Sequence, residues 1–192
     1  MKRLFLLGLV LLGGCVVQSF QPFYGDAYKA DAPEVFGQWK VASIGADSNV
    51  AYKAWVFTED YKLLTHDDKG LSGHLQTTFF KIGTQLFCDA EIVNIPEGKF
   101  NAFWMLHIRG THTLYKADVT KDKLTFIPLS FEWFKKGLAA KEFELPHVRT
   151  TKEDDFLMTA TGDQWAKFLR KYAADTNAFP EANAFVLRKP QS

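Results

Sequence analysis

The chain has 192 residues, a length that fits one domain with a sizeable core. Hydrophobic residues make up 47% and charged residues 23%, which excludes a wholly disordered protein. The formal net charge of +1 argues against a nucleic-acid-binding protein, which normally carries a basic excess. Two cysteines are too few for a disulfide-rich scaffold or a four-cysteine zinc site. The unusual feature is the aromatic content of 15%, with 18 Phe and 5 Trp.

The N-terminus has the pattern of a secretory signal peptide. A charged start, Met1-Lys2-Arg3, precedes an apolar run over 4–12, which is too short for a bilayer span of about 20 residues. The run ends in Leu12-Gly13-Gly14-Cys15, which resembles the lipobox of bacterial lipoproteins. The resemblance implies that residues 1–14 are a signal peptide and that Cys15 is acylated and becomes the first residue of the mature chain. The alternative is an ordinary signal peptide that ends beside a cysteine.

Lipidation of Cys15 would leave Cys88 as the chain's only thiol, so no intramolecular disulfide could form. Two or more acyl chains hold a protein stably at a membrane. Val16 follows the lipobox cysteine, at the position where enterobacterial lipoproteins of the inner membrane carry Asp. The resemblance therefore implies a lipid-anchored protein of the bacterial cell envelope, in the outer membrane and facing the periplasm.

Residues 15–35 show no clear hydrophobic period and contain two prolines, Pro22 and Pro33. This composition predicts a tether that holds the folded domain away from the membrane. The aromatic residues of the segment, among them Phe20 and Phe23, could instead dock on the domain or lie at the lipid interface. No internal repeat or second linker follows, so residues 36–190 are predicted to form a single β-rich domain.

Short runs rich in β-branched and aromatic residues fill most of that domain. Polar and apolar residues alternate in several runs, as in Gln38-Trp39-Lys40-Val41. Turn residues separate the runs at intervals of about 8–12 residues, which is typical of an antiparallel sandwich or barrel. The expected strands are Gly37–Ile44, Ala51–Thr58, Tyr61–His66, His74–Ile82, Gln85–Asn94, Ala102–Ile108, Thr111–Val119 and Lys123–Pro128.

Two helices and two short strands are expected after these runs. Ser130 is the predicted N-cap of a helix over 131–141. Thr161 and Gln164 form a capping-box pattern at the start of a helix over 164–174, whose aromatic stripe is expected to pack on the sheet. The short strands are expected at 155–160 and 184–188. The predicted fold class is therefore mainly β (α+β), an antiparallel barrel-like sheet of about eight strands with two helices.

The segment Gly37-Gln38-Trp39 resembles the Gly-x-Trp motif on the first barrel strand of lipocalins. In that family the Trp closes the barrel floor and often stacks on a late Arg, for which Arg188 is the candidate here. A helix and a short terminal strand after about eight strands also match, and some bacterial lipocalins are lipoproteins. The helix over 131–141 and the segment 142–155 would be an insertion before the last barrel strand. A lipocalin-like barrel and a different antiparallel barrel or α+β sheet both remain open.

His107 and His112 are weak candidates for metal ligands. If Arg109-Gly110 formed a two-residue turn, the two imidazoles would face each other across a hairpin, and with Asp118 or Glu91 they could hold a transition metal. Arg-Gly is a poor primed turn, however, and in a continuous strand an odd separation puts the histidines on opposite faces. We therefore expect no metal site and no cofactor.

Sequence patterns of enzyme active sites are missing. Cys88 lies beside Asp89 but has no histidine fixed next to it, so a buried structural thiol is expected. Gly70-Leu71-Ser72-Gly73 lacks the spacing of a serine-hydrolase elbow. Glu153-Asp154-Asp155 fits a solvated loop better than a pair of catalytic carboxylates. The sequence therefore predicts a protein that is not an enzyme.

The aromatic residues of the strands could either line an apolar cavity or fill the core. We interpret the chain as a lipid-anchored, non-catalytic envelope protein that binds a small hydrophobic ligand. The alternative is an envelope-assembly or structural adaptor that contacts a protein partner. The membrane and a hydrophobic molecule or envelope protein are thus the expected partners, and nucleic acid is not. The expected ligand-lining residues are Phe79, Phe87, Phe103, Trp104 and Phe126.

Overall fold

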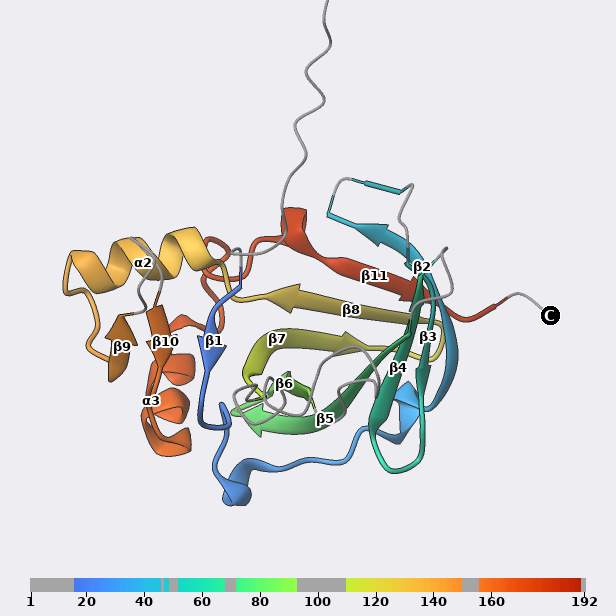
Figure 1. Ribbon diagram of the computed structural model, residues 1–192, viewed down its shortest axis with the longest axis horizontal. Coiled ribbons are helices and arrows are strands. Elements are labelled where there is room, and N and C mark those ends of the chain that lie inside the picture. The colour runs from blue at the N-terminus through green and yellow to red at the C-terminus, as the bar shows by residue number, and fades with distance from the viewer. Residues whose placement is uncertain are drawn as a thin grey trace, which may run out of the picture.

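A closed barrel of eight antiparallel strands forms the centre of the computed structural model, which describes residues 16–45, 47–48, 52–67, 72–92, 110–149 and 156–190 (Figure 1). The first seven barrel strands pair in chain order, and the C-terminal strand β11 pairs with both β8 and β2, which closes the barrel. The strands are β2 (Gly37–Ile44), β3 (Tyr52–Phe57), β4 (Lys62–Asp67), β5 (Ser72–Ile82), β6 (Gln85–Ile92), β7 (His112–Val119), β8 (Lys123–Pro128) and β11 (Phe185–Arg188). The predicted fold class is confirmed.

The barrel strands agree closely with the predicted runs. Strands β2 and β8 begin and end at the predicted residues, and β6 begins at Gln85 as predicted; its predicted end at Asn94 lies outside the described residues. The predicted strand Ala102–Ile108 lies outside the described residues. The eighth barrel strand is instead β11, which was expected only as a short terminal strand.

The barrel strands fall into two groups that differ in how many faces they bury. In β2, Trp39 and Val41 point into the barrel and are buried, while Gln38 and Lys40 are exposed on the outside. In β5, by contrast, Phe79 belongs to the barrel interior and Phe80 to a second core outside it. Successive side chains of a strand point to opposite faces, so two adjacent buried phenylalanines require cover on both faces.

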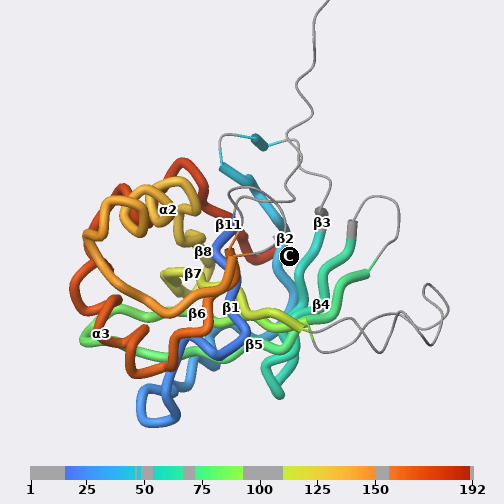
Figure 2. The backbone as a smooth tube through the Cα atoms, turned by 60° about the vertical axis from the view of Figure 1, so that its left-hand side comes forward, coloured from blue at the N-terminus to red at the C-terminus, as the bar shows by residue number. Residues whose placement is uncertain are grey.

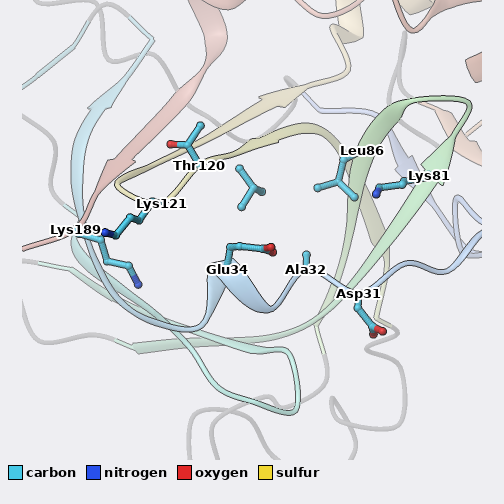
Figure 3. Close-up of a pocket in the computed structure, with 9 residues that line it drawn as sticks. Asp31, Ala32, Glu34, Lys81, Leu86, Thr120, Lys121 and Lys189 are labelled. Atoms are coloured by element: carbon cyan, nitrogen blue, oxygen red, sulfur yellow. The ribbon is translucent and has the colours of Figure 1, made fainter.

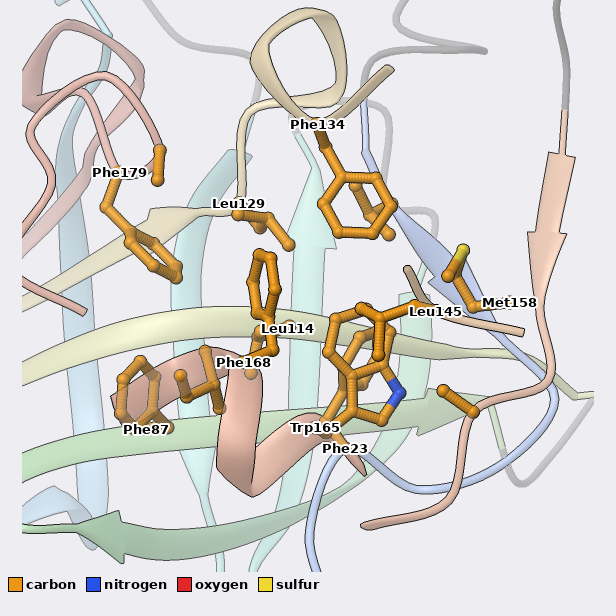
Figure 4. Close-up of a cluster of buried hydrophobic side chains, with 14 of the residues drawn as sticks. Phe23, Phe87, Leu114, Leu129, Phe134, Leu145, Met158, Trp165, Phe168 and Phe179 are labelled. Atoms are coloured by element: carbon orange, nitrogen blue, oxygen red, sulfur yellow. The ribbon is translucent and has the colours of Figure 1, made fainter. Parts of the chain in front are cut away.

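The cover comes from two helices and three short strands that lie on one flank of the barrel, away from β3 and β4 (Figure 2). Side chains of the two helices, of one of the short strands and of the N-terminal segment form the outer core together with the outward side chains of β5–β8; Phe23, Phe87, Phe134, Trp165 and Phe168 are among its members (Figure 4). The covering elements are α2 (Phe131–Ala139), α3 (Gly162–Tyr172), β1 (Gln18–Ser19), β9 (His147–Arg149) and β10 (Phe156–Met158). Three 3-10 turns, η1 (Asp26–Tyr28), η2 (Pro33–Val35) and η3 (Glu181–Asn183), complete the fold.

Helix α2 begins at the predicted residue, whereas α3 follows the predicted cap Thr161 directly and so begins and ends two residues earlier than the predicted 164–174. The Ser130 hydroxyl accepts a hydrogen bond from the Trp133 backbone N–H at the start of α2. In the capping box of α3, the Gln164 backbone N–H donates to Thr161 Oγ1, and the Thr161 backbone N–H donates to Gln164 Oε1 at 2.8 Å. Helix α2 ends two residues earlier than predicted, because Lys141 adopts a positive φ of 57° that no α-helix can continue.

The N-terminal segment is part of the folded domain, which corrects the prediction of a tether over 15–35 for its described part, residues 16–35. Phe23 is fully buried, its ring lies 4.5 Å from that of Trp165, and its backbone N–H donates to Asp89 Oδ2 at 2.9 Å. A Cβ at Gly162 would clash with the Tyr24 carbonyl oxygen, so α3 approaches this segment as closely as glycine allows. Aromatic anchors hold the segment on the barrel although it lacks a hydrophobic period.

Replacing Phe23 with alanine tests whether the N-terminal segment stabilises the domain. We expect Phe23→Ala to lower the free energy of unfolding by about 3–5 kcal/mol, because it opens a cavity beside Trp165. The matched control is Phe20→Ala in the same segment, where the ring is 45% exposed and the expected change is within about 0.5 kcal/mol. Urea unfolding measures both, and an equally small effect of the two substitutions would support a free tether.

Candidate functional site

The inside of the barrel is largely filled by its own side chains. Trp39, Phe57, Phe79 and Phe126 are each at most 2% exposed. The rings of the three phenylalanines contact one another, with centroids 6.0, 6.3 and 6.4 Å apart. Offset and tilted ring contacts at such distances are favourable and close-packed, so these side chains act as core residues of the barrel.

A cavity of about 30 Å³ remains in the barrel interior. Its volume suits one or two water molecules and is far below the roughly 300–1,000 Å³ of small-molecule pockets. Trp55 lines it, and the buried Nε1–H of that indole has no hydrogen-bond partner among the described residues. The cavity is lined from six consecutive strands by Trp55, Phe57, Leu63, Leu75, Thr77, Cys88, Ala90, Tyr115 and Phe126. The cavity is therefore a small, mostly apolar space inside the barrel.

The structure brings together two of the predicted ligand-lining residues. Phe79 and Phe126 both lie in the barrel interior. Phe87 lies on the opposite face of its strand, in the outer core, where its ring is stacked 5.4 Å from that of Phe80. Its placement follows from the pleat, because the neighbouring Cys88 points inward. Phe103 and Trp104 lie outside the described residues.

Cys88 is the buried free thiol that was expected. Burial raises the pKa of the thiol well above its ordinary value, and the charge of Asp89 raises the pKa further. A thiol held protonated in this way is a poor nucleophile, since the thiolate is the reactive form. Cys88 therefore serves as a small apolar wall residue of the cavity.

Trp39 is held in place by contacts with η2 and with a lysine near the C-terminus. The Trp39 Nε1–H donates to the Val35 carbonyl of η2 at 2.6 Å, and Lys189 Nζ lies 4.0 Å from the centroid of the indole ring. The same ammonium donates to the Phe36 carbonyl at 2.9 Å. Gly37 has a φ of 102°, a conformation that only glycine adopts readily, which explains the first residue of the motif.

The cation over Trp39 is Lys189, which corrects the expectation that Arg188 would fill this role. Arg188 is exposed and lies in register with Lys40 and Lys123 on the outer surface of the barrel. Leu187 points inward, so the alternation of β11 turns Arg188 outward. Lys189, the residue after Arg188, lies again on the side of Trp39.

A groove of about 530 Å³, lined by both charged and apolar side chains, lies beside Trp39 and Lys189 (Figure 3). Lys121 and Lys189 lie on one side of it, Lys81 and Asp31 on the other, and Glu34 between them. The groove thus mixes cationic and anionic groups, and it is open to solvent. Its chemistry does not suit the hydrophobic ligand that the aromatic content suggested.

A buried histidine–aspartate pair links the barrel to the N-terminal segment. The Nδ1–H of His112 donates to Asp89 Oδ1 at 2.7 Å, while the other carboxylate oxygen accepts the Phe23 backbone N–H. His112 Nε2 lies 3.9 Å from Glu91 Oε1. Burial alone would lower the pKa of His112, but the hydrogen bond and charge of Asp89 and the charge of Glu91 outweigh it, so the pKa is raised above 6.5. Sequence reasoning had placed Asp89 beside Cys88 only, since the pairing depends on the β6–β7 register.

The histidine–aspartate pair does not extend into a serine triad. Ser19 lies opposite His112 where β1 pairs with β7. Its hydroxyl, however, donates to the Met158 carbonyl at 3.4 Å and accepts the Gln21 backbone N–H at 3.2 Å. The hydroxyl is therefore engaged by the backbone, where a nucleophile would need the imidazole as its base.

The metal interpretation of His107 and His112 is only partly within the structure, because His107 lies outside the described residues. His112 uses Nδ1 for Asp89. Within the described ranges, no group of three or more His, Cys, Asp or Glu residues is arranged to hold a metal ion.

Comparison of the chain with protein-family models, with curated proteins and with solved structures gave no match. Over the parts of the chain that the structure describes, no helix has the length and apolar character needed to cross a membrane.

The raised pKa of His112 makes the stability of the protein depend on pH. Since the folded-state pKa is above the ordinary value of 6.5, the contribution of the charged pair is complete below pH 6.5 and is lost as pH rises through the folded-state pKa. We expect the difference in free energy of unfolding between the wild type and His112→Gln to shrink from about pH 5.5 to about pH 8.5. Chemical denaturation across this range measures it.

The control is His74→Gln, which removes an exposed histidine of β5 and should change the free energy of unfolding by no more than about 0.5 kcal/mol. A stability difference for His112→Gln that grows with pH would contradict the assignment of a charged pair.

Proposed function

We propose that this protein is a lipid-anchored, non-catalytic protein of the bacterial cell envelope whose barrel binds a small hydrophobic ligand. The observation that carries ligand binding is the apolar cavity beside the unpartnered Trp55 Nε1–H. A buried donor without a partner costs free energy, and a ligand with one acceptor atom would satisfy it. The lipobox resemblance at Leu12-Gly13-Gly14-Cys15 supports the anchor.

A lipocalin-like architecture supports this function. The Gly-x-Trp segment lies on the first barrel strand, a 3-10 turn precedes it, and a C-terminal cation covers the indole of Trp39. The barrel departs from the family pattern because α2, β9, β10 and α3 are inserted between β8 and β11. The inserted elements cover the outer face of the barrel and contribute no residue to the lining of the interior cavity.

The cavity limits the size of the ligand. A space of about 30 Å³ accepts a molecule of a few heavy atoms or the end of a longer apolar chain. A larger ligand would need Trp55 or Tyr115 to change rotamer, because both line the space. Burial raises the pKa of the Tyr115 hydroxyl, so this group stays neutral and adds no charge to the wall.

The second candidate function is a structural adaptor that contacts an envelope protein. The largely filled interior favours it, since Trp39, Phe57, Phe79 and Phe126 already form a close-packed core without a ligand. A ligand inside the barrel distinguishes the two functions.

Native mass spectrometry of the full-length protein, released from detergent, tests the ligand. We expect a small apolar adduct on the wild type and its loss in Ala90→Leu, because the added side chain fills the cavity. Lys40→Leu places the same side chain on the exposed face of β2 and should retain the adduct. A wild type without an adduct would favour the adaptor, and an adduct that survives Ala90→Leu would place the ligand elsewhere.

Metabolic labelling with a fatty-acid probe tests the anchor. Cys15→Ser should abolish labelling and release the protein from the membrane fraction, since the acyl chains would have no attachment site. Cys88→Ser removes the other cysteine, which is buried, and should leave labelling unchanged. Labelling that persists in Cys15→Ser would contradict the lipobox assignment.

A further inference from the structure

The folded domain begins directly after the proposed lipid attachment site. Val16 forms a β-bridge with Ser130, and Val17 is 1% exposed. The Cα atoms of consecutive residues are about 3.8 Å apart, so Cys15 is attached to the domain surface without a free linker. A flexible segment of about 20 residues would instead span roughly 25 Å and leave the domain free to rotate. Acylation at Cys15 therefore fixes which face of the domain meets the membrane.

The face next to this attachment point is one side of the sheet extension formed by β1, β10 and β9 (Figure 1). In the segment that begins with Val16, the buried residues Val17 and Ser19 alternate with the less buried Val16, Gln18 and Phe20. Four residues of extended chain span about 13 Å, so Phe20 lies within that distance of Val16. The anchor and this face are thus close neighbours.

The same face carries exposed apolar side chains. Phe20, Ile92 and Val148 are the large hydrophobic residues exposed in the described part of the chain, at 45%, 47% and 49%. The strand registers place all three near one row of paired residues that crosses five strands. The row consists of Glu91, His112, Ser19, Met158 and His147.

The three apolar residues project from the same face of the sheet, with Ile92 and Phe20 on one side of the row and Val148 on the other. Ile92 and Phe20 each lie one residue beyond the row, and Val148 lies one residue along β9 from it. Met158 points into the outer core, so its neighbour Leu157 and the paired Val148 point to the open face. Exposed apolar side chains on one open face of a sheet are a candidate interaction surface.

We propose that the open face of β1, β10 and β9, with Phe20 and Val148 at its centre, lies on the lipid bilayer to which Cys15 is anchored. This inference rests on the proposed lipid anchor. A bilayer fits because the anchor emerges from the edge of this face and because aromatic and aliphatic side chains partition into the membrane interface.

Site-specific fluorescence tests the orientation in the lipidated full-length protein. Phe20→Cys, Val148→Cys and the control Lys40→Cys, on the exposed face of β2, are each labelled with an environment-sensitive thiol dye. Cys88 is buried, and Cys15 carries the lipid, so the dye reacts at the introduced thiol. The proteins are reconstituted into phosphatidylcholine–phosphatidylglycerol vesicles with lipids spin-labelled near the headgroup.

We expect the spin-labelled lipids to quench the dye several times more strongly at positions 20 and 148 than at position 40. Equal quenching at all three positions would overturn the inference. A blue-shifted dye at 20 and 148 without quenching would assign the face to a second copy or another protein, which also overturns it.

Fatty-acid labelling of the same preparations separates this inference from the proposed function. Unlabelled protein rejects the anchor and the orientation together. Labelled protein with unquenched dyes rejects the orientation alone and leaves the anchor in place.

Discussion

The structure depends on strands that are buried on both faces. In β5, β6 and β8, adjacent residues serve two cores at once: Phe79 and Phe80, Phe87 and Cys88, Phe126 and Ile127. Any movement that widened the barrel would also shift the side chains of the outer core, because both sets project from the same backbone. This constraint explains why a barrel with so many aromatic residues holds a cavity of only about 30 Å³. The outer layer of helices stiffens the barrel as well as covering it.

Asp89 is a polar residue buried among these strands, and its side chain also connects separate parts of the structure. Its carboxylate lies in a buried strand, which is costly unless each oxygen has a partner. His112 and the Phe23 N–H provide one partner each, so β6, β7 and the N-terminal segment meet at a single side chain. The imidazole and the carboxylate thus join three segments of the chain.

Local patterns in the sequence predict most barrel strands and both helices. Contacts between residues far apart in the chain are not predicted by such patterns. Alternation identified β2, and the capping signals at Ser130 and Thr161 located both helices, because these signals involve residues a few positions apart. The docking of Phe23 on Asp89 and Trp165 joins residues far apart in the chain, and no local pattern in residues 15–35 reveals it.

The candidate site was harder to predict than the fold, for a geometric reason. A shift of one residue along a strand exchanges its two faces, so the choice between Phe87 and Cys88, or between Arg188 and Lys189, depends on register. Phe79 and Phe126 lie in the interior while their equally apolar neighbours Phe80 and Ile127 take the other face, so residue type alone does not separate the two faces. The sequence does not indicate that the Trp55 N–H is buried without a hydrogen-bond partner, because this depends on the packing of the folded state.

The N-terminal segment joins the two halves of the proposed function. Residues 16–23 begin directly after Cys15, the proposed lipid attachment site. They add β1 to the sheet and place Phe23 in the outer core. A force or reorientation at the membrane would therefore act directly on β7 and on the outer core, since β1 pairs with β7 and no slack intervenes. The outer core shares β5, β6 and β8 with the cavity wall. The N-terminal segment, the outer core and the wall of the cavity are therefore joined through strands that they share, and a shift of one would displace the others.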